Sequence, residues 1–170
     1  MTEEQKRQFF YEFAQGAYSG IKDTLSNLDN KINNLFTLNA GLITVVTGLT
    51  YFIVQYLLLN GKYSPVLLTP VAFSLFCFVA SVVLGVVAYA PAERGVVEPE
   101  ELMVELRNET YLRVLSRAAA TISYAARVNS DLATRKSRRV RWMSWLLSGG
   151  LGLAVLGFII FFIALGSSAH

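Results

Sequence analysis

Apolar side chains recur at alternating steps of three and four residues along the first third of the chain. These positions are Tyr11, Ala14, Tyr18, Ile21, Leu25, Leu28, Ile32 and Leu35. Such spacing is typical of a helix that packs against another helix. Its next steps are Asn39, Leu42, Val46, Leu49 and Ile53, and no charged residue lies between Lys31 and Lys62. A membrane span needs about 20 mostly apolar residues, so the pattern predicts one long helix, cytoplasmic in its first half and membrane-embedded in its second.

The apolar runs divide the whole chain into segments of an all-α membrane protein. We expect a cytoplasmic amphipathic helix at residues 1–35 and transmembrane helices at 36–59, 65–90 and 142–165. Residues 91–141 form a cytoplasmic helical segment, and 166–170 a flexible outer tail. A tight turn at Asn60-Gly61 joins the first two spans, Pro99 opens a helix, and Asn108 is a candidate N-cap for the helix that leads into the third span.

A second apolar seam precedes the third span. It consists of Leu112, Leu115, Ala119, Ile122, Ala126, Asn129 and Ala133. Both seams lead directly into a span, so we predict that their helices pack antiparallel as a cytoplasmic stalk of roughly 35 to 40 Å at 1.5 Å per residue. Packing within one subunit is the main expectation for residues 1–35, and a coiled coil between subunits or a helix on the membrane surface are the alternatives.

Composition predicts a membrane protein, and the distribution of charge predicts its orientation in the membrane. Hydrophobic residues make up 54% of the 170 positions, more than a soluble domain usually carries. Ten of the fifteen Lys and Arg residues lie between Pro91 and Arg141, and four lie in the amino-terminal segment. The positive-inside tendency therefore predicts a multi-pass protein of the cell inner (plasma) membrane, with the amino terminus in the cytoplasm and the carboxyl terminus outside.

Polar and small residues mark particular faces of the spans. Pore-lining candidates in the first span are Asn39, Thr44, Thr47, Tyr51 and Gln55. A bare amide in lipid is costly, so Asn39 either holds helix register or lines a pore. Small residues recur along the second span, at Ser74, Cys77, Ser81, Gly85 and Ala88, and predict a close helix contact. The third span contains Gly149, Gly150, Gly152 and Gly157, which permit either close packing or a bend.

A line of mostly cationic side chains follows the helix that precedes the third span. It comprises Arg113, Arg117, Tyr124, Arg127, Asp131, Arg135 and Arg138, on the side opposite the apolar seam. A solvated or salt-bridging face is one interpretation, and lipid phosphates account for the arginines nearest the membrane. Guanidinium groups with an aromatic ring among them also suit phosphates and stacked bases, so Arg113, Arg117, Tyr124 and Arg127 are the candidate ligand-binding residues.

Two stretches lead into the first and third spans with a recognisable sequence. They are Leu28-Asp29-Asn30-Lys31 leading into Asn39-Ala40-Gly41-Leu42, and Asn108-Glu109-Thr110-Tyr111-Leu112 continuing through Asn129 and Arg135-Lys136 into the third span. At these residues the chain resembles the SLATT-type and Pycsar transmembrane-type effectors of prokaryotic nucleotide-signalled antiphage defence. The resemblance implies a membrane-disrupting oligomeric pore, controlled by a nucleotide or oligonucleotide that a partner nucleotidyltransferase makes. Multidomain members carry a nucleotide-sensing domain, whereas this sequence shows no separate one.

Enzymatic chemistry finds little support in the sequence. No Cys and His pair, phosphate-cradling glycine loop or intramembrane carboxylate cluster is present, so we expect neither catalysis nor a cofactor or metal. Cys77 is the only cysteine and reads as a small packing residue, while His170 belongs to the tail. Glu100, Glu101, Glu105 and Glu109 form a solvated patch.

These features favour a homo-oligomeric pore or ion channel in membrane lipid, with the first span lining its axis and the stalk regulating it. The alternative is a non-conducting membrane scaffold or accessory subunit that anchors a cytoplasmic partner through the same stalk. A single span cannot enclose water, so the channel hypothesis requires a symmetric assembly.

Overall fold

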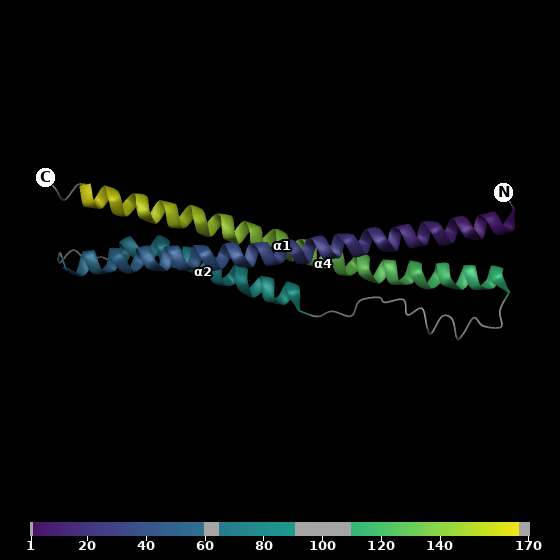
Figure 1. Cartoon of the computed structure of the whole chain (residues 1–170). Coiled ribbons are helices and arrows are strands. Elements are labelled where there is room, and N and C mark those ends of the chain that lie inside the picture. The colour runs from purple at the N-terminus through teal and green to yellow at the C-terminus, as the bar shows by residue number, and fades with distance from the viewer. Residues whose placement is uncertain (1, 60–64, 91–109, 167–170) are drawn as a thin grey trace. The chain divides into compact units, whose positions relative to one another are not determined.

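The computed structural model describes residues 2–59, 65–90 and 110–166, and these residues form three helices (Figure 1). They are α1 (Glu3–Leu59), α2 (Pro65–Tyr89) and α4 (Tyr111–Gly166). All three are long and apolar enough to cross a membrane. The predicted continuity of α1 from its polar half into the first span is confirmed, and α4 is likewise unbroken. The expected turn at Asn60-Gly61, the helix at Pro99, the cap at Asn108, the acidic patch at 100–109 and the tail at His170 lie outside the described residues.

Local hydrogen bonds fix the start of α1. Thr2 Oγ1 accepts the backbone N–H of Gln5, and Gln5 Oε1 accepts the backbone N–H of Thr2 at 2.9 Å. This reciprocal pair is a capping box, which satisfies amide groups that a helix leaves free at its first turn. Glu3 and Glu4 lie in that turn, and their negative charges stabilise the helix because they are close to the positive end of its dipole. Short-range chemistry therefore accounts for where α1 begins.

The described chain forms two compact units, and α1 and α4 each contribute to both. One unit, here called the polar unit, contains Met1–Asn30 and Pro91–Ser137. The other, here called the membrane unit, contains Lys31–Ala90 and Arg138–His170. The polar unit carries most of the described charged side chains, and the membrane unit holds the long apolar runs.

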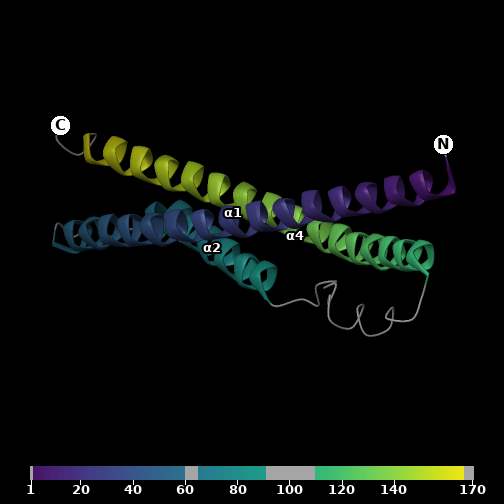
Figure 2. The same cartoon turned by 45° about the vertical axis from the view of Figure 1, so that its right-hand side comes forward.

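In the polar unit, α1 and α4 run parallel, so the predicted antiparallel pairing is wrong. Arg7 of α1 donates to the Leu112 carbonyl at 2.8 Å, near the start of α4. At the far end of the unit, Asp29 pairs with Lys136 at 2.6 Å. Figures 1 and 2 show the beginnings of α1 and α4 at the same end. The reason is topological: α2 returns the chain across the membrane unit, so the first and third spans point the same way and so do their extensions.

The predicted seams are the sides on which these helices pack. Ala14, Leu25 and Ile32 of α1 are buried, as are Leu115 and Ile122 of α4. The α4 seam continues in the same three-and-four rhythm through the membrane unit, where its buried members are Val140, Met143, Leu147, Gly150, Ala154, Gly157 and Phe161. One apolar stripe thus lies along nearly the whole of α4, as expected for knobs-into-holes packing.

In the membrane unit, α2 runs against both other helices. Val71 near its start packs in one core cluster with Val46 of α1 and Ala154 of α4. Near its end, Ser81 contacts Asn39 and Met143. The predicted small face of α2 is buried at Ser74, Ser81, Gly85 and Ala88 and half-buried at Cys77. Arg139 of α4 donates to the Val87 carbonyl at 2.9 Å, satisfying an acceptor in the last turn of α2.

Glycines in this unit serve as points of close approach, which decides between the two roles that the sequence left open. A Cβ on Gly150 would lie 2.8 Å from the Phe78 ring, and one on Gly157 would lie 2.8 Å from Val71 Cγ2. A Cβ on Gly149 or Gly152 would meet nothing within 4 Å. Gly150 and Gly157 therefore allow α2 to pack against α4, and the other two face outward.

Candidate functional site

The arginine line lies on the outer surface of the polar unit. Arg113, Arg117 and Arg127 are exposed, and the Tyr124 ring is 71% exposed. Helical geometry puts these residues on the side of α4 away from α1, because α4 packs on α1 through Leu115 and Ile122. Their charges are therefore presented outward, as the sequence predicts.

A groove that the sequence pattern did not predict lies beside this line. It measures about 380 Å³ and is formed between α1 and α4 of the polar unit. Its lining residues are Arg7, Phe10, Phe13, Ser116, Ala119, Ala120 and Ser123. The signal was present at Arg7, which lies four residues before Tyr11 and so continues the apolar seam backwards with a charged side chain. A guanidinium at a position of the seam that is otherwise apolar indicates that polar groups interact there.

Hydrogen bonds hold the Arg7 guanidinium at one side of the groove. Its Nη1 donates to the Leu112 carbonyl at 2.8 Å and to Ser116 Oγ at 3.1 Å. Glu3 lies 3.7 Å from Nε, beyond a good hydrogen bond, and its carboxylate is 66% exposed. Within the described part of the chain Nη2 has no hydrogen-bond partner. A planar cation held through one nitrogen can donate from another to an anion.

Asn39 is enclosed within the subunit, in contrast to the other pore-lining candidates. Its side chain has no exposed surface, and its Nδ2 donates to Ser81 Oγ at 2.9 Å. Ser81 in turn donates to the Met143 carbonyl at 3.2 Å. The chain Asn39–Ser81–Met143 thus links all three helices. This geometry supports register between helices, and Asn39 has no surface in this structure to offer a pore.

The remaining candidates, Thr44, Thr47, Tyr51 and Gln55, share an exposed face of α1 in the membrane unit. Thr44 Oγ1 donates to the Ala40 carbonyl at 2.9 Å, and Gln55 Nε2 donates to the Tyr51 hydroxyl at 2.7 Å. Thr37, Ala40, Gly41 and Gly48 are also exposed, and their positions on the helix put them on this face. Small and polar side chains therefore follow one face of a membrane span.

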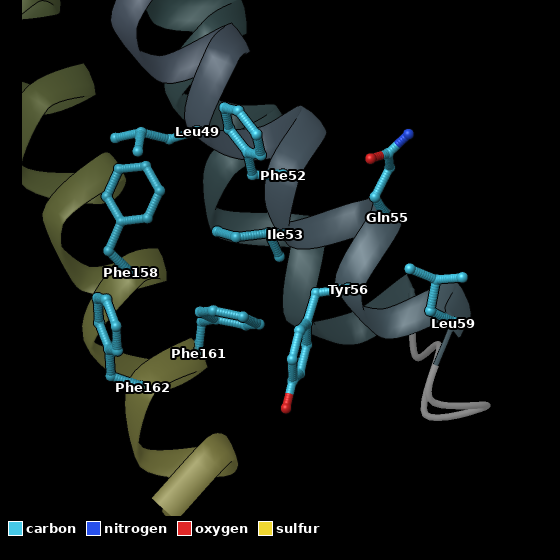
Figure 3. A pocket seen from close by; sticks show the side chains of 9 residues that line it. All are labelled: Leu49, Phe52, Ile53, Gln55, Tyr56, Leu59, Phe158, Phe161 and Phe162. Atoms are coloured by element: carbon cyan, nitrogen blue, oxygen red, sulfur yellow. The ribbon is translucent and has the colours of Figure 1, made fainter.

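A second groove, of about 660 Å³, lies between α1 and α4 in the membrane unit (Figure 3). It is lined by Leu49, Phe52, Ile53, Gln55, Tyr56, Leu59, Phe158, Phe161 and Phe162. Aromatic rings form much of its wall, and Tyr56 meets Phe161 edge to face with ring centroids 6.3 Å apart. Apart from Gln55 and the Tyr56 hydroxyl the walls are hydrocarbon, which suits contact with lipid more than with a polar ligand.

The polar unit also contains an interhelical ion pair near its end. Lys136 occupies a seam position of α4, its side chain is 6% exposed, and its Nζ lies 2.6 Å from Asp29 Oδ1. Buried ion pairs add little net stability, but they penalise other registers because a misplaced charge stays unpaired. Among the described residues no group of three or more His, Cys, Asp or Glu side chains is placed to hold a metal ion.

Comparison with known families identifies the chain. A family model described as the Pycsar effector protein domain (PycTM) matches residues 13–164. The chain belongs to the Pycsar effector family. The resemblance noted from the sequence is thereby confirmed for its Pycsar part, and it indicates a membrane effector of cyclic-nucleotide antiphage defence. Pycsar transmembrane effectors are membrane effectors rather than enzymes. No curated protein and no solved structure is significantly similar to this Pycsar effector.

Proposed function

We propose that the chain is a homo-oligomeric pore or ion-channel effector of the inner membrane. The observation that supports this most is the exposed face of α1 at Thr44, Thr47, Tyr51 and Gln55. Hydrocarbon gives such groups no hydrogen-bond partner, so polar residues in a span commonly face another helix or a water-filled cavity. One subunit leaves this face open, and several copies around an axis would cover it.

The exposed side of the same span next to this face is apolar. Leu38, Val45 and Phe52 are 51%, 57% and 69% exposed, and the heptad repeat places them on one side of α1. Lipid covers such side chains without cost. α1 thus has one side suited to lipid and another suited to water or a second subunit, the division expected of a helix at a pore axis.

Thiol accessibility tests this assignment. In a Cys77→Ser background, single cysteines at Thr44, Thr47 or Tyr51 should react with a charged thiol reagent in lipid vesicles, and the reaction should change the conductance. Matched cysteines at Leu38, Val45 or Phe52 should not react, because lipid excludes the charged reagent. A wild-type protein that releases no dye from vesicles and gives silent planar bilayers under every nucleotide condition would favour the membrane scaffold.

We further propose that a cyclic nucleotide from a partner cyclase or related nucleotidyltransferase controls this activity through the polar unit. Family membership supports the nature of the signal, and the exposed Arg113, Arg117, Tyr124 and Arg127 offer cations and a ring to it. The amino terminus and the polar unit would then lie in the cytoplasm, where nucleotides are made. Labelling of cysteines at Lys6 and Arg117 from either side of sealed vesicles tests that orientation.

A further inference from the structure

We infer that the groove between α1 and α4 in the polar unit is the seat of a single nucleotide. This inference rests on the proposed control by a nucleotide signal and assigns it a place and a size. The seat comprises Arg7, Phe10, Phe13, Ser116, Ala120 and Ser123. It would bind phosphate at Arg7 and stack the base on the phenylalanine rings.

The size of the groove bears on the number of nucleotides. Its volume of about 380 Å³ lies near the lower end of the 300–1,000 Å³ that small-molecule sites occupy. One nucleoside monophosphate fills a site of this order, whereas a dinucleotide or longer chain would extend outside it. The sequence left open whether the ligand is a nucleotide or an oligonucleotide, and the groove favours the former.

The cationic groups around the groove match a phosphate. Arg7 is fixed by two hydrogen bonds from Nη1, which leaves its Nη2 directed to other partners. On α4, the residues 113, 116, 120, 123 and 127 follow one another at steps of three and four, so they share a helix face. Arg113 and Arg127 therefore bracket the part of that face formed by Ser116, Ala120 and Ser123. Neither arginine lines the groove itself: along α4, Arg113 lies three residues before Ser116 and Arg127 lies four residues after Ser123.

The aromatic wall matches a base. Phe10 and Phe13 are 61% and 68% exposed although they lie in the polar unit. Exposed rings at a concave surface offer faces for stacking, which is largely independent of the base identity. Ala119 and Ala120 leave room opposite the rings, because larger side chains on α4 would close the groove. Ser116 and Ser123 supply hydroxyl groups that can bond sugar or base edges.

Binding to the full chain in lipid nanodiscs tests the seat. The probe is a fluorescent nucleoside 3′,5′-cyclic monophosphate, displaced in turn by unlabelled cyclic mononucleotides, a linear trinucleotide and inorganic phosphate. We expect displacement by at least one cyclic mononucleotide, and weaker displacement by the trinucleotide and by phosphate alone. Arg7→Gln should lower the affinity about tenfold or more, since a charge-assisted contact is lost.

Matched variants separate the groove from its surroundings. Phe13→Ala and the groove-filling Ala120→Trp should weaken binding at least tenfold. Thr121→Trp adds bulk at an exposed position of α4 that does not line the groove, so it should bind as the wild type does. Melting and size-exclusion profiles verify that each variant is folded and assembled.

Three outcomes would overturn the seat. They are the absence of binding by any nucleotide, wild-type affinity of Arg7→Gln and Ala120→Trp, and dissociation of the oligomer by Ala120→Trp, which would make the groove a contact between copies. Dye release from vesicles distinguishes this failure from failure of the proposed function. Nucleotide-triggered release that survives Ala120→Trp leaves the pore intact and removes the seat, whereas binding without any release retains the seat and removes the pore.

Discussion

Single residues determine how closely the helices approach and at which register. Gly150 and Gly157 lie where α4 meets α2, and the Asp29–Lys136 pair joins α1 to α4. Gly149, next to Gly150, lies on an open surface and serves as a control for the effect of packing.

Gly150→Ala should destabilise the membrane unit by about 1 to 3 kcal/mol, because the new methyl group would lie 2.8 Å from the Phe78 ring and 3.1 Å from Cys77 Cβ. Gly149→Ala is the adjacent control, since its methyl group would meet no atom within 4 Å. Thermal unfolding in detergent, followed by circular dichroism, measures the difference. Equal melting temperatures for the two variants would contradict the close approach of α2 and α4.

Asp29→Asn should destabilise the polar unit by about 3 to 5 kcal/mol, because the Lys136 ammonium, whose side chain is 6% exposed, would then face a neutral amide in place of a carboxylate. The double variant Asp29→Leu with Lys136→Met should recover much of this loss, since both charges are gone. The coupling is read from a double-mutant cycle of unfolding free energies. Additive effects of the two substitutions would show that the pair does not act as a unit.

At the scale of elements, the relative direction of α1 and α4 determines which residues of the two helices are in contact. Hydrogen bonds between α1 and α4 in the polar unit join residues that are 105, 107 and 109 apart in sequence. Parallel helices keep such an offset constant, while antiparallel ones would keep the sum of the two numbers constant. The two arrangements thus pair different seam residues.

Cysteines at Tyr11 and Ala119, which are 108 apart, should therefore crosslink within one subunit through a short thiol reagent. Cysteines at Tyr11 and Ala133 should not, although both are seam positions, because a parallel pair separates them by several turns. Cys77→Ser provides the background, and mobility on denaturing gels gives the readout. Crosslinking of the second pair alone would restore the antiparallel arrangement.

At the scale of the whole molecule, the function depends on how copies of the chain meet. Thr44 and Thr47 lie on the exposed face of α1 that we assign to the pore axis. Replacing both by Leu should make that face apolar and reduce dye release from vesicles by at least tenfold. The bundle should still fold, because neither side chain is buried.

Val45→Leu with Phe52→Leu is the control for this double substitution, since these side chains are exposed on the apolar side. Dye release should remain near the wild-type level in the control. Equal loss in both double variants, with melting temperatures unchanged, would place the pore elsewhere.

The sequence by itself determined the helices, their spans and the faces that pack. These properties are local: the three-and-four spacing defines a stripe on a helix, and the length of an apolar run defines a span. The tertiary structure decided what each stripe meets. A seam does not encode its partner's direction. The parallel direction of α1 and α4 follows from the three spans, which make the first and third run the same way, and the contacts of Arg7 and Lys136 show it. Likewise, only the packed helices showed that Asn39 is enclosed by Ser81, and that Arg7 borders a groove, because each depends on residues distant in sequence.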